Sequence, residues 1–532
     1  MNDMISSNPQ IGKDIIESLT LGMYEDCRFI YREYIQNAAD AVDKAINHAL
    51  LKKGEEAIHV RIDADKRIIS IHDNATGIPQ DKVMTILRNI AHSTKKRGED
   101  KGFRGIGRLG GLGYCSKLIF ETSYYGEPIK SIMTWDAYLM KNIINDRENS
   151  EEATDVLSKV AKVETEKENS DAHYFNVIME NVSSDELLDV ESVSDYLSMV
   201  APVDISSSFI FRQKINDFKK ENGLTVDTYN IFINDDQIYK PYTGAIYEDN
   251  NGGKKRVDDI IDVKFLMAKD DYGTIIYWGW YSISSLKGQM KPKNHARGIR
   301  LRKENIQIGD EEICKKFFTK TEDQRFSFYY FGEIHALSKG LVPNSRRDYF
   351  GESKECIEFE QRIRQDFLEL KELCYDAQRL RSSTSTIAKG EELRATIQDK
   401  EKNGYTSQKE RDELRRRLEE QEKKEEQAQR QLANVKAKIS SKDSPLKTVL
   451  DQFETSTPTK DKEQNQKDFG EATSENVKDA KTRYRTDKPI YSRYSKSEKK
   501  LIGKIYTAIG NAIADERLRE ALISNIEEQI IK

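Results

Sequence analysis

The sequence predicts an α+β protein of several domains, followed by a largely helical and polar C-terminal region. Residues 11–50 place apolar side chains at helical spacing, and Ile58, Val60 and Ile62 then alternate as in a half-buried strand. A second alternating apolar region begins at residues 229–233. The chain has 532 residues, which is enough for two to four domains.

Composition excludes some classes of protein. Charged residues make up 33% of the chain and apolar residues 37%, so part of it is expected to lack a core. The net charge of −5 argues against a general nucleic-acid coat, although not against a local basic patch. The five cysteines show no CxxC pairing, which favours reduced thiols and a cytoplasmic localisation. No run of about 18 apolar residues occurs, so we expect no membrane partner.

A polar face is predicted on the first long helix. Residues three and four positions apart share a helix face, which places Glu33, Asn37 and Asp40 together with Ala41 close by. Unpaired charge is costly in a core, and a solvated face does not need alanines. The face therefore suits a wet pocket, where a carboxylate orients water and an amide oxygen binds Mg²⁺. A plain surface helix is the alternative.

A strand and turn follow at residues 68–79. Strand periodicity puts Ile69, Ile71 and Asp73 on one face, so Asp73 ends an apolar row. There it can accept a hydrogen bond from a flat ligand lying beside Ile78. An Asp-Asn turn that merely closes a strand is the alternative.

A glycine-rich stretch occupies residues 102–113. Its glycines leave backbone amides free to approach phosphate oxygens. Taken alone, such a stretch is more often a flexible loop.

Together, these three stretches resemble the GHKL ATPase superfamily, which includes gyrase, the heat shock protein 90 chaperones, histidine kinases and MutL-type proteins. The pattern ExxxNxxDA at 33–41 looks like the first box of that family, and DxxxG at 73–77 looks like its adenine box. The run GxRGIGxLGGLG at 102–113 looks like its phosphate loop, and residues 90–95 resemble the lid segment of the chaperones.

The resemblance implies a Bergerat-type sandwich, a mixed sheet with helices on one face, that binds and hydrolyses ATP with Mg²⁺. It implies that Glu33 is the general base and that Asn37 is the magnesium ligand. The other nucleotide-binding residues that we expect are Asp40, Asp73, Gly77, Ile78, Lys95, Gly105, Gly107 and Gly110.

Two departures from the family pattern concern the adenine. Ala75 replaces the first glycine of the adenine box. The family also places a threonine near the end of a later strand, but the expected strand at 174–179 offers none. Both departures bear on the selectivity of the predicted site for adenine.

Residues 297–303 and 341–348 resemble the second, transducer domain of the heat shock protein 90 and MutL branch. In the chaperones, a loop of this domain delivers an arginine to the γ-phosphate, and Arg347 matches that place. A guanidinium that comes from another domain makes domain closure depend on ATP. A surface loop with two solvated arginines is the alternative.

We expect the chain to be organised in the following order. The segments are a GHKL ATP-binding domain at 1–184 with an insertion at about 136–172, a connector at 185–226, a transducer-like middle domain at 227–378, a charged helical segment at 379–440, a disordered basic linker at 441–497 and a C-terminal helical hairpin at 498–532.

The C-terminal third gives weaker signals. Residues 408–440 predict a charged single helix or a short, weak coil, because the apolar positions have a long gap. Residues 478–504 interleave basic residues with tyrosines, which suits nucleic acid but also an ordinary basic linker. Ile505, Ile509 and Ile513 begin an apolar stripe that favours docking or a homodimer.

The sequence thus predicts an ATP-gated clamp of the heat shock protein 90 type that acts on a protein client. A MutL- or MORC-like nucleic-acid clamp is the first alternative, and a bacterial defence or stress-response ATPase switch is the second. We find no domain with a nucleophilic tyrosine, which argues against a topoisomerase. We also find no phospho-accepting histidine helix ahead of the ATPase, which argues against a histidine kinase.

Overall fold

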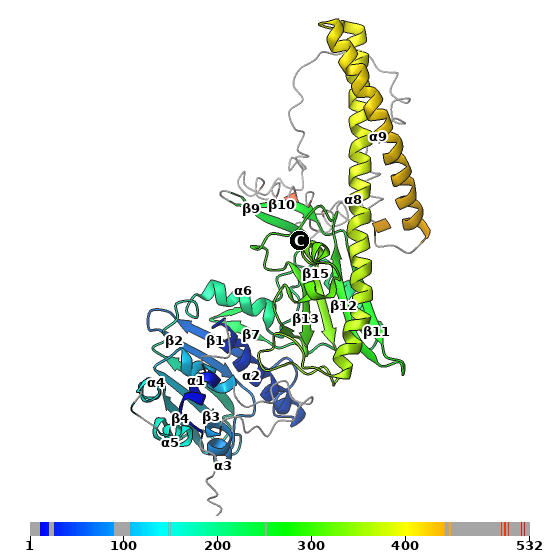
Figure 1. Ribbon diagram of the computed structural model, residues 1–532. Coiled ribbons are helices and arrows are strands. Elements are labelled where there is room, and N and C mark those ends of the chain that lie inside the picture. The colour runs from blue at the N-terminus through cyan, green and yellow to red at the C-terminus, as the bar shows by residue number, and fades with distance from the viewer. Residues whose placement is uncertain are drawn as a thin grey trace, which may run out of the picture. The chain divides into compact units, whose positions relative to one another are not determined.

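The computed structural model describes residues 11–20, 26–89, 107–146, 148, 151–250, 253–441 and 446–447, and isolated positions between 499 and 526 (Figure 1). The chain divides into two compact units, Met1–Thr457 and Pro458–Lys532. The first unit contains an eight-stranded sheet, a five-stranded sheet, a two-stranded ribbon and two long helices.

The first sheet has eight strands in the order β5-β4-β3-β6-β2-β1-β7-β8. All neighbours are antiparallel except β1 and β7, so the sheet is mixed. The strands are β1 Ile58–Asp63, β2 Ile68–Asp73, β3 Lys117–Ser123, β4 Ile129–Asp136, β5 Ala161–Lys167, β6 Tyr174–Glu180, β7 Ile231–Ile233 and β8 Asp236–Gln237.

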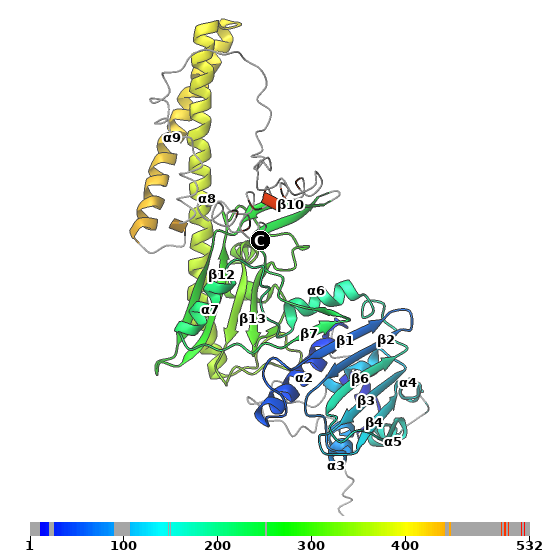
Figure 2. The same ribbon diagram turned by 180° about the vertical axis from the view of Figure 1, so that it is seen from behind.

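Helices cover one face of this sheet, and Figure 2 shows the strands from the other side. Every second residue of β2 is buried, including Ile69, Ile71 and Asp73, which confirms the predicted alternation. The fold predicted for this region is therefore confirmed. The helical segments are α1 Asp14–Thr20, α2 Phe29–Asn47, α3 Gln80–Val83, the π turn η1 Met84–Arg88, the 3-10 helix η2 Gly107–Gly113, α4 Ala137–Asn145, α5 Ala153–Val160 and α6 Val190–Val200.

Two local expectations need correction. The expected insertion at 136–172 contains α4, α5 and β5, and β5 pairs with β4 along its length, so this region extends the sheet. The strand expected to open the second domain, β7, instead pairs with β1 of the first sheet. Ile231 and Ile233 are buried there, because they continue the apolar face of β1.

A second sheet lies further along the chain and confirms the predicted second α/β region. Its order is β11-β12-β15-β13-β14, and a separate two-stranded ribbon precedes it. The elements are α7 Arg212–Glu221, β9 Ala245–Asn250, β10 Gly253–Asp259, β11 Asp262–Lys269, β12 Ile275–Ile283, β13 Gly298–Lys303, β14 Ile306–Ile308, η3 Ile313–Phe317, η4 Thr321–Tyr329 and β15 Phe331–Ala336.

Two long helices, α8 Lys354–Asn403 and α9 Gln408–Ser441, follow and pack against each other. The first half of α8 buries an apolar row, which includes Phe359, Ile363 and Phe367, in the core of the second sheet. Contacts between Lys400 and Glu410 near one end of the pair and between Lys438 and Asp376 near the other make the pair antiparallel. The single charged helix predicted as one alternative is therefore wrong.

The seam of α9 explains the gap in apolar positions. Its less exposed residues repeat with heptad spacing, and two of them, Gln421 and Glu425, are polar. Glu425 crosses α8 at Gly390, where an added Cβ would lie 1.1 Å from its Oε1, and it pairs with Arg394. The Nε2 of Gln421 donates to the carbonyl of Thr386 at 2.7 Å. Both polar residues of the seam thus have a partner on the other helix.

In the second unit, Tyr506 and Ile523 form a small buried cluster with Ile502, Ile509 and Ile526 around it. Ile505 is 46% exposed, so the stripe is shifted from the predicted 505/509 register. Most of the basic stretch at 478–504 and most of the predicted linker lie outside the described residues.

All five cysteines are free thiols, and four of them are buried. Among the described residues, no helix combines the length and the apolar character needed to cross a membrane.

Candidate active site

Helix α2 presents Glu33 to the glycine-rich turn η2. Ile35, Ala39 and Val42 are fully buried against the sheet, which fixes the rotation of the helix. A Cβ on Gly107 would lie only 2.0 Å from Oε2 of Glu33. Real Cβ atoms do not approach so closely, so a larger residue at 107 would displace the Glu33 carboxylate from this position.

Glu33 also contacts Arg347, which comes from the region of the second sheet. Oε1 of Glu33 lies 3.3 Å from Nε of Arg347, and the two side chains are 14% and 10% exposed. This Oε1 is buried and accepts no hydrogen bond among the described residues, so the contact is an ion pair without hydrogen-bond alignment. Two residues that the sequence proposed as catalytic, 314 positions apart, are therefore adjacent.

The loop around Arg347 holds this residue in an unusual backbone conformation. Its φ is +56°, in the left-handed region that side chains other than glycine seldom adopt. Its N–H donates to the carbonyl of Asn344 at 3.2 Å, and its own carbonyl accepts from Gly309 at 2.8 Å. Burial lowers the pKa of Arg347, and the Glu33 carboxylate opposes that effect.

Asp73 occupies the predicted place at the end of β2. It is buried, and its Oδ1 accepts a hydrogen bond from the N–H of Ala75 at 3.1 Å. Burial raises the pKa of Asp73 to about 7, against smaller lowering effects of hydrogen bonds from the backbone of Ala75 and Phe175. Asp73 has no cationic partner among the described residues, and a buried carboxyl group of this kind is suited to a hydrogen-bond donor from a ligand.

The turn after Asp73 lies against two neighbouring strands. Gly77 has φ +64°, and a Cβ there would lie 1.9 Å from the carbonyl oxygen of Ser123, so this position requires glycine. The N–H of Ile78 donates to Oγ1 of Thr122 at 2.8 Å, and that hydroxyl donates to the carbonyl of Tyr174 at 3.1 Å. The threonine beside the turn thus comes from β3, whereas sequence reasoning looked for it on β6.

The remaining predicted residues divide into three groups. Asn37 and Asp40 lie one and two turns beyond Glu33 on α2, and Asp40 is buried. Gly110 packs on α2, where an added Cβ would make an ordinary 3.5 Å contact with Ile30. Lys95 and Gly105 lie outside the described residues. The structure thus places Glu33, Gly107 and Arg347 in contact, and it groups Asp73, Gly77 and Ile78 at the end of β2.

Arg108 is a further, half-buried residue of the turn that sequence reasoning did not single out. Its Nη2 donates to the carbonyl of Asn89, the residue that follows η1. Burial lowers the pKa of Arg108 to about 10. Arg108 therefore ties the glycine-rich turn to the end of η1.

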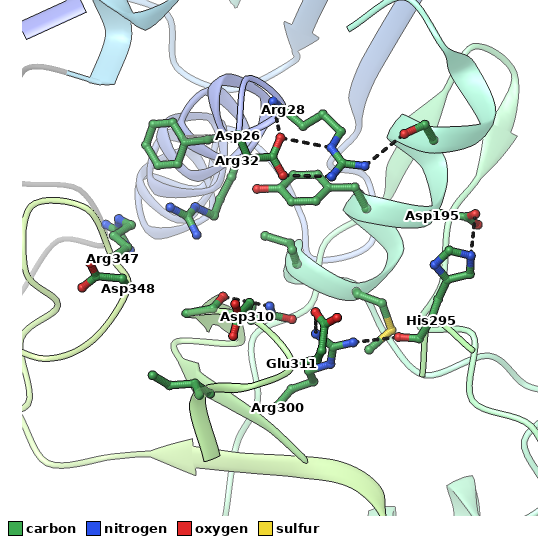
Figure 3. Close-up of a pocket in the computed structure, with 18 of the residues that line it drawn as sticks. Asp26, Arg28, Arg32, Asp195, His295, Arg300, Asp310, Glu311, Arg347 and Asp348 are labelled. Atoms are coloured by element: carbon green, nitrogen blue, oxygen red, sulfur yellow. Dashed lines mark hydrogen bonds and ion pairs between the residues drawn. The ribbon is translucent and has the colours of Figure 1, made fainter. Parts of the chain in front are cut away.

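A cavity of about 840 Å³ lies next to the Glu33–Arg347 contact (Figure 3). The start of α2, helix α6 and loops of the second sheet line it, and its wall includes Arg32, Arg300, Asp310 and Arg347. The pair of His295 Nε2 and Asp195 Oδ2, 3.2 Å apart, bridges two of its walls. Asn37, Asp73 and Gly107 do not line this cavity, so it adjoins the predicted nucleotide site without being that site.

Residues 27–175 match the family described as histidine kinase-, DNA gyrase B-, and HSP90-like ATPase. This stretch is a GHKL-type ATPase domain. The match begins two residues before α2 and ends within β6, so it includes Glu33, Asp73 and the glycine-rich turn. It ends well before Arg347, which means that the contact with Glu33 joins the ATPase domain to a region outside the match.

Part of the chain is similar to bacterial chaperones. It is 29% identical over 143 residues to the chaperone protein HtpG of Escherichia coli strain K12 and, equally, to that of Escherichia coli O6:H1. The match covers 24% of this chain and 23% of each relative, so the chain aligns with less than a quarter of the length of these proteins.

Proposed function

We propose that this chain is an ATP-hydrolysing, chaperone-like protein of the heat shock protein 90 type that works as an ATP-gated clamp. The contact of Glu33 in the ATPase domain with Arg347 from the second sheet region supports it most directly. It gives the nucleotide site a charged group from outside the ATPase domain, so that the state of the nucleotide can bias the arrangement of the two regions. The partial similarity to HtpG supports the chaperone-like character.

The residues present fit a magnesium-bound nucleotide. The backbone of Gly107 approaches Glu33 without a Cβ in the way, and Asp73 offers a buried carboxyl group beside a glycine turn. In this proposal, Asp73 accepts a hydrogen bond from the adenine amine, and the amide oxygen of Asn37 binds Mg²⁺, a hard cation that prefers oxygen ligands. When bound, Mg²⁺ supplies charge neutralisation on the phosphates.

Glu33 acts as the general base in this mechanism. Its Oε1 has no aligned hydrogen-bond donor among the described residues, so it can orient a water molecule and accept its proton. Arg347 now forms an ion pair with this carboxylate. A terminal phosphate offers the guanidinium two acceptor oxygens in a fork geometry, and it therefore competes with Glu33 for Arg347. The exchange of partners frees the base and ties the second region to the nucleotide.

The cavity beside this contact gives the two regions room to approach each other. It is about 840 Å³ and is lined from both sides by charged residues, including Arg32 on α2 and Asp310 after β14.

In the proposed cycle, two chains associate through their C-terminal clusters around Tyr506 and close on a protein client. The proposed localisation is cytoplasmic.

Steady-state ATP hydrolysis with Mg²⁺, measured for the wild type and for Glu33→Ala, tests the proposal. We expect Glu33→Ala to bind ATP with nearly unchanged affinity and to lose about 1,000-fold in kcat, as general-base removal does. Asp81→Ala, at an exposed position of α3, is the control and should hydrolyse ATP normally. Normal turnover by Glu33→Ala would show that the assigned base is wrong.

A second measurement separates the chaperone-like clamp from the nucleic-acid clamp. The wild type should keep a denatured model protein soluble in an ATP-dependent way. ATP-dependent binding to duplex DNA that weakens steeply with salt would instead favour the MutL- or MORC-like alternative.

A further inference from the structure

The residue after the proposed base, Tyr34, is joined to the glycine-rich turn. Tyr34 is only 3% exposed, and its hydroxyl donates to the carbonyl of Arg108 at 3.0 Å. The same hydroxyl accepts from the N–H of Gly111 at 3.1 Å. These two backbone groups lie three residues apart, the separation that a 3-10 helix joins directly with an i→i+3 hydrogen bond. The tyrosine oxygen therefore bridges one turn of η2.

The surroundings fit this bridge closely. A Cβ on Gly111 would lie 2.6 Å from the Tyr34 oxygen and 2.9 Å from Sδ of Met179, so no larger residue fits opposite the hydroxyl. Burial raises the pKa of Tyr34. The hydroxyl thus stays neutral at physiological pH and can both donate and accept.

Three residues of α2 hold the turn together. Ile30 lies against Gly110, and Glu33 lies against Gly107. The hydroxyl of Tyr34 bonds to the backbone of Arg108 and Gly111. Their spacing of i, i+3 and i+4 places them on one face of the helix. Of these three residues, it is Tyr34 whose side chain hydrogen-bonds to the backbone of the turn, so its hydroxyl limits how far η2 can move along α2.

We propose that Tyr34 is a positioning residue that fixes the glycine-rich turn relative to the Glu33 carboxylate. The inference rests on the proposed ATP hydrolysis and assigns a role in it to a residue that acts through the glycine-rich turn. Without the hydroxyl, the Arg108 carbonyl and the Gly111 N–H lose their common partner, η2 is held less firmly against α2, and Gly107 shifts relative to Glu33.

The test is Tyr34→Phe, compared with Tyr31→Phe as a matched control. Tyr31 is also fully buried on α2, and its hydroxyl donates to the carbonyl of Leu187 at 2.6 Å, away from the turn. Both variants keep the ring and lose a buried hydroxyl. We expect Tyr34→Phe to lose about tenfold in kcat, with KM for ATP changed by less than about threefold, while Tyr31→Phe keeps its kcat. The two variants should have similar melting temperatures.

Amide hydrogen exchange without nucleotide gives a readout independent of ATP hydrolysis. The amides of residues 107–113 should exchange about tenfold faster in Tyr34→Phe than in Tyr31→Phe. Equal exchange in the two variants, or equal losses in kcat, would overturn the proposal, and so would fast exchange with normal kcat. If the wild type does not hydrolyse ATP, the proposed function and the catalytic part of this inference fail together. The exchange rates then still decide whether the hydroxyl holds the turn.

Discussion

Two buried carboxyl groups, one in each sheet region, have opposite surroundings. Asp73 ends β2, and its described hydrogen bonds come from backbone N–H groups. Glu333 lies on β15, only 1% exposed, and side chains surround it. Its partners are Lys240 Nζ at 3.0 Å, Arg302 Nε at 2.6 Å, Tyr242 Oη at 2.9 Å and His335 Nε2 at 3.0 Å.

The difference appears in the acidity of the two groups. Burial acts to raise the pKa of each carboxyl group. For Asp73 this effect dominates, and the pKa is about 7. For Glu333, Arg302 and Lys240 outweigh burial and hold the pKa well below its ordinary value. A fully partnered carboxylate is structural, whereas one that lacks a cation keeps the capacity to bind a ligand.

The Glu333 cluster also connects the second sheet to the chain that enters it. Nη2 of Arg302 donates to the carbonyl of Met199 at the end of α6, at 2.7 Å. Nδ2 of Asn305 donates to the carbonyl of Asp227 at 2.7 Å. Strand β14 begins just after Asn305 and ends just before Gly309, whose N–H donates to the carbonyl of Arg347. The Glu333 cluster therefore holds the strand that leads to this contact.

The largest effect on stability is expected from Glu333→Gln. The substitution leaves Lys240 and Arg302 buried without an anion, which should cost about 4 kcal/mol in the free energy of unfolding. Urea denaturation monitored by tryptophan fluorescence measures it. The control is Glu311→Gln, which weakens the less buried pairs with Arg297 and Arg300 and should cost about 1 kcal/mol. Similar costs for both variants would contradict the structural role of Glu333.

An intermediate effect is expected from Arg347→Ala. Arg302 pairs with the structural carboxylate of Glu333, whereas Arg347 is proposed to exchange the Glu33 carboxylate for a phosphate. We expect Arg347→Ala to lose about 30-fold in kcat, or about 2 kcal/mol of transition-state stabilisation, with ATP affinity nearly unchanged. Arg346→Ala is the matched control, because that side chain is exposed. A kcat that falls equally in both variants would remove Arg347 from the mechanism.

A pH-dependent difference in stability is expected between the wild type and Asp73→Asn. Since the folded pKa of about 7 lies above the unfolded value, the folded state binds more protons between about pH 4 and 7. The stability contributed by protonated Asp73 is complete below pH 4 and is lost as the pH rises through 7. Relative to Asp73→Asn, the wild type should lose up to about 1.4 kcal/mol per pH unit in this range.

Thermal unfolding of both proteins across pH 4–8 measures this slope. Parallel stability curves would show that Asp73 is not the titrating group. The same variant should bind ATP about tenfold more weakly, because its amide group offers a donor where the adenine amine needs an acceptor. Calorimetric titration with ATP checks that part.

Local periodicity made most of the ATPase domain predictable. The helix that carries Glu33 and the strand that ends at Asp73 both follow from apolar spacing within a few residues. The contact between Glu33 and Arg347 has no local signal, because 314 residues separate the partners, and only the resemblance to a known family suggested it. The role of Tyr34 was missed for a similar reason: its partners lie 74 and 77 residues away, and its own position looks like ordinary core.

The long helices show a second limit of sequence reasoning. The heptad seam of α9 contains Gln421 and Glu425, which look like solvated positions until their partners on α8 are known. Likewise, three apolar residues at 231–233 suit either sheet, and pairing with β1 decides between them. Tertiary partners therefore determined the features that local patterns left open.

The crossing of Glu425 over Gly390 has a mechanical consequence. This alignment sets the carboxylate opposite a residue without a side chain, so Gly390 favours it over one in which α9 is shifted along α8 by a heptad. About 20 residues of α8 extend beyond its last contacts with the second sheet, which is about 30 Å at 1.5 Å per residue. A tilt of about 10° at the base of such a stiff lever displaces its tip by about 5 Å. A small rotation of the second sheet would thereby move the tip of the helix pair by several ångströms.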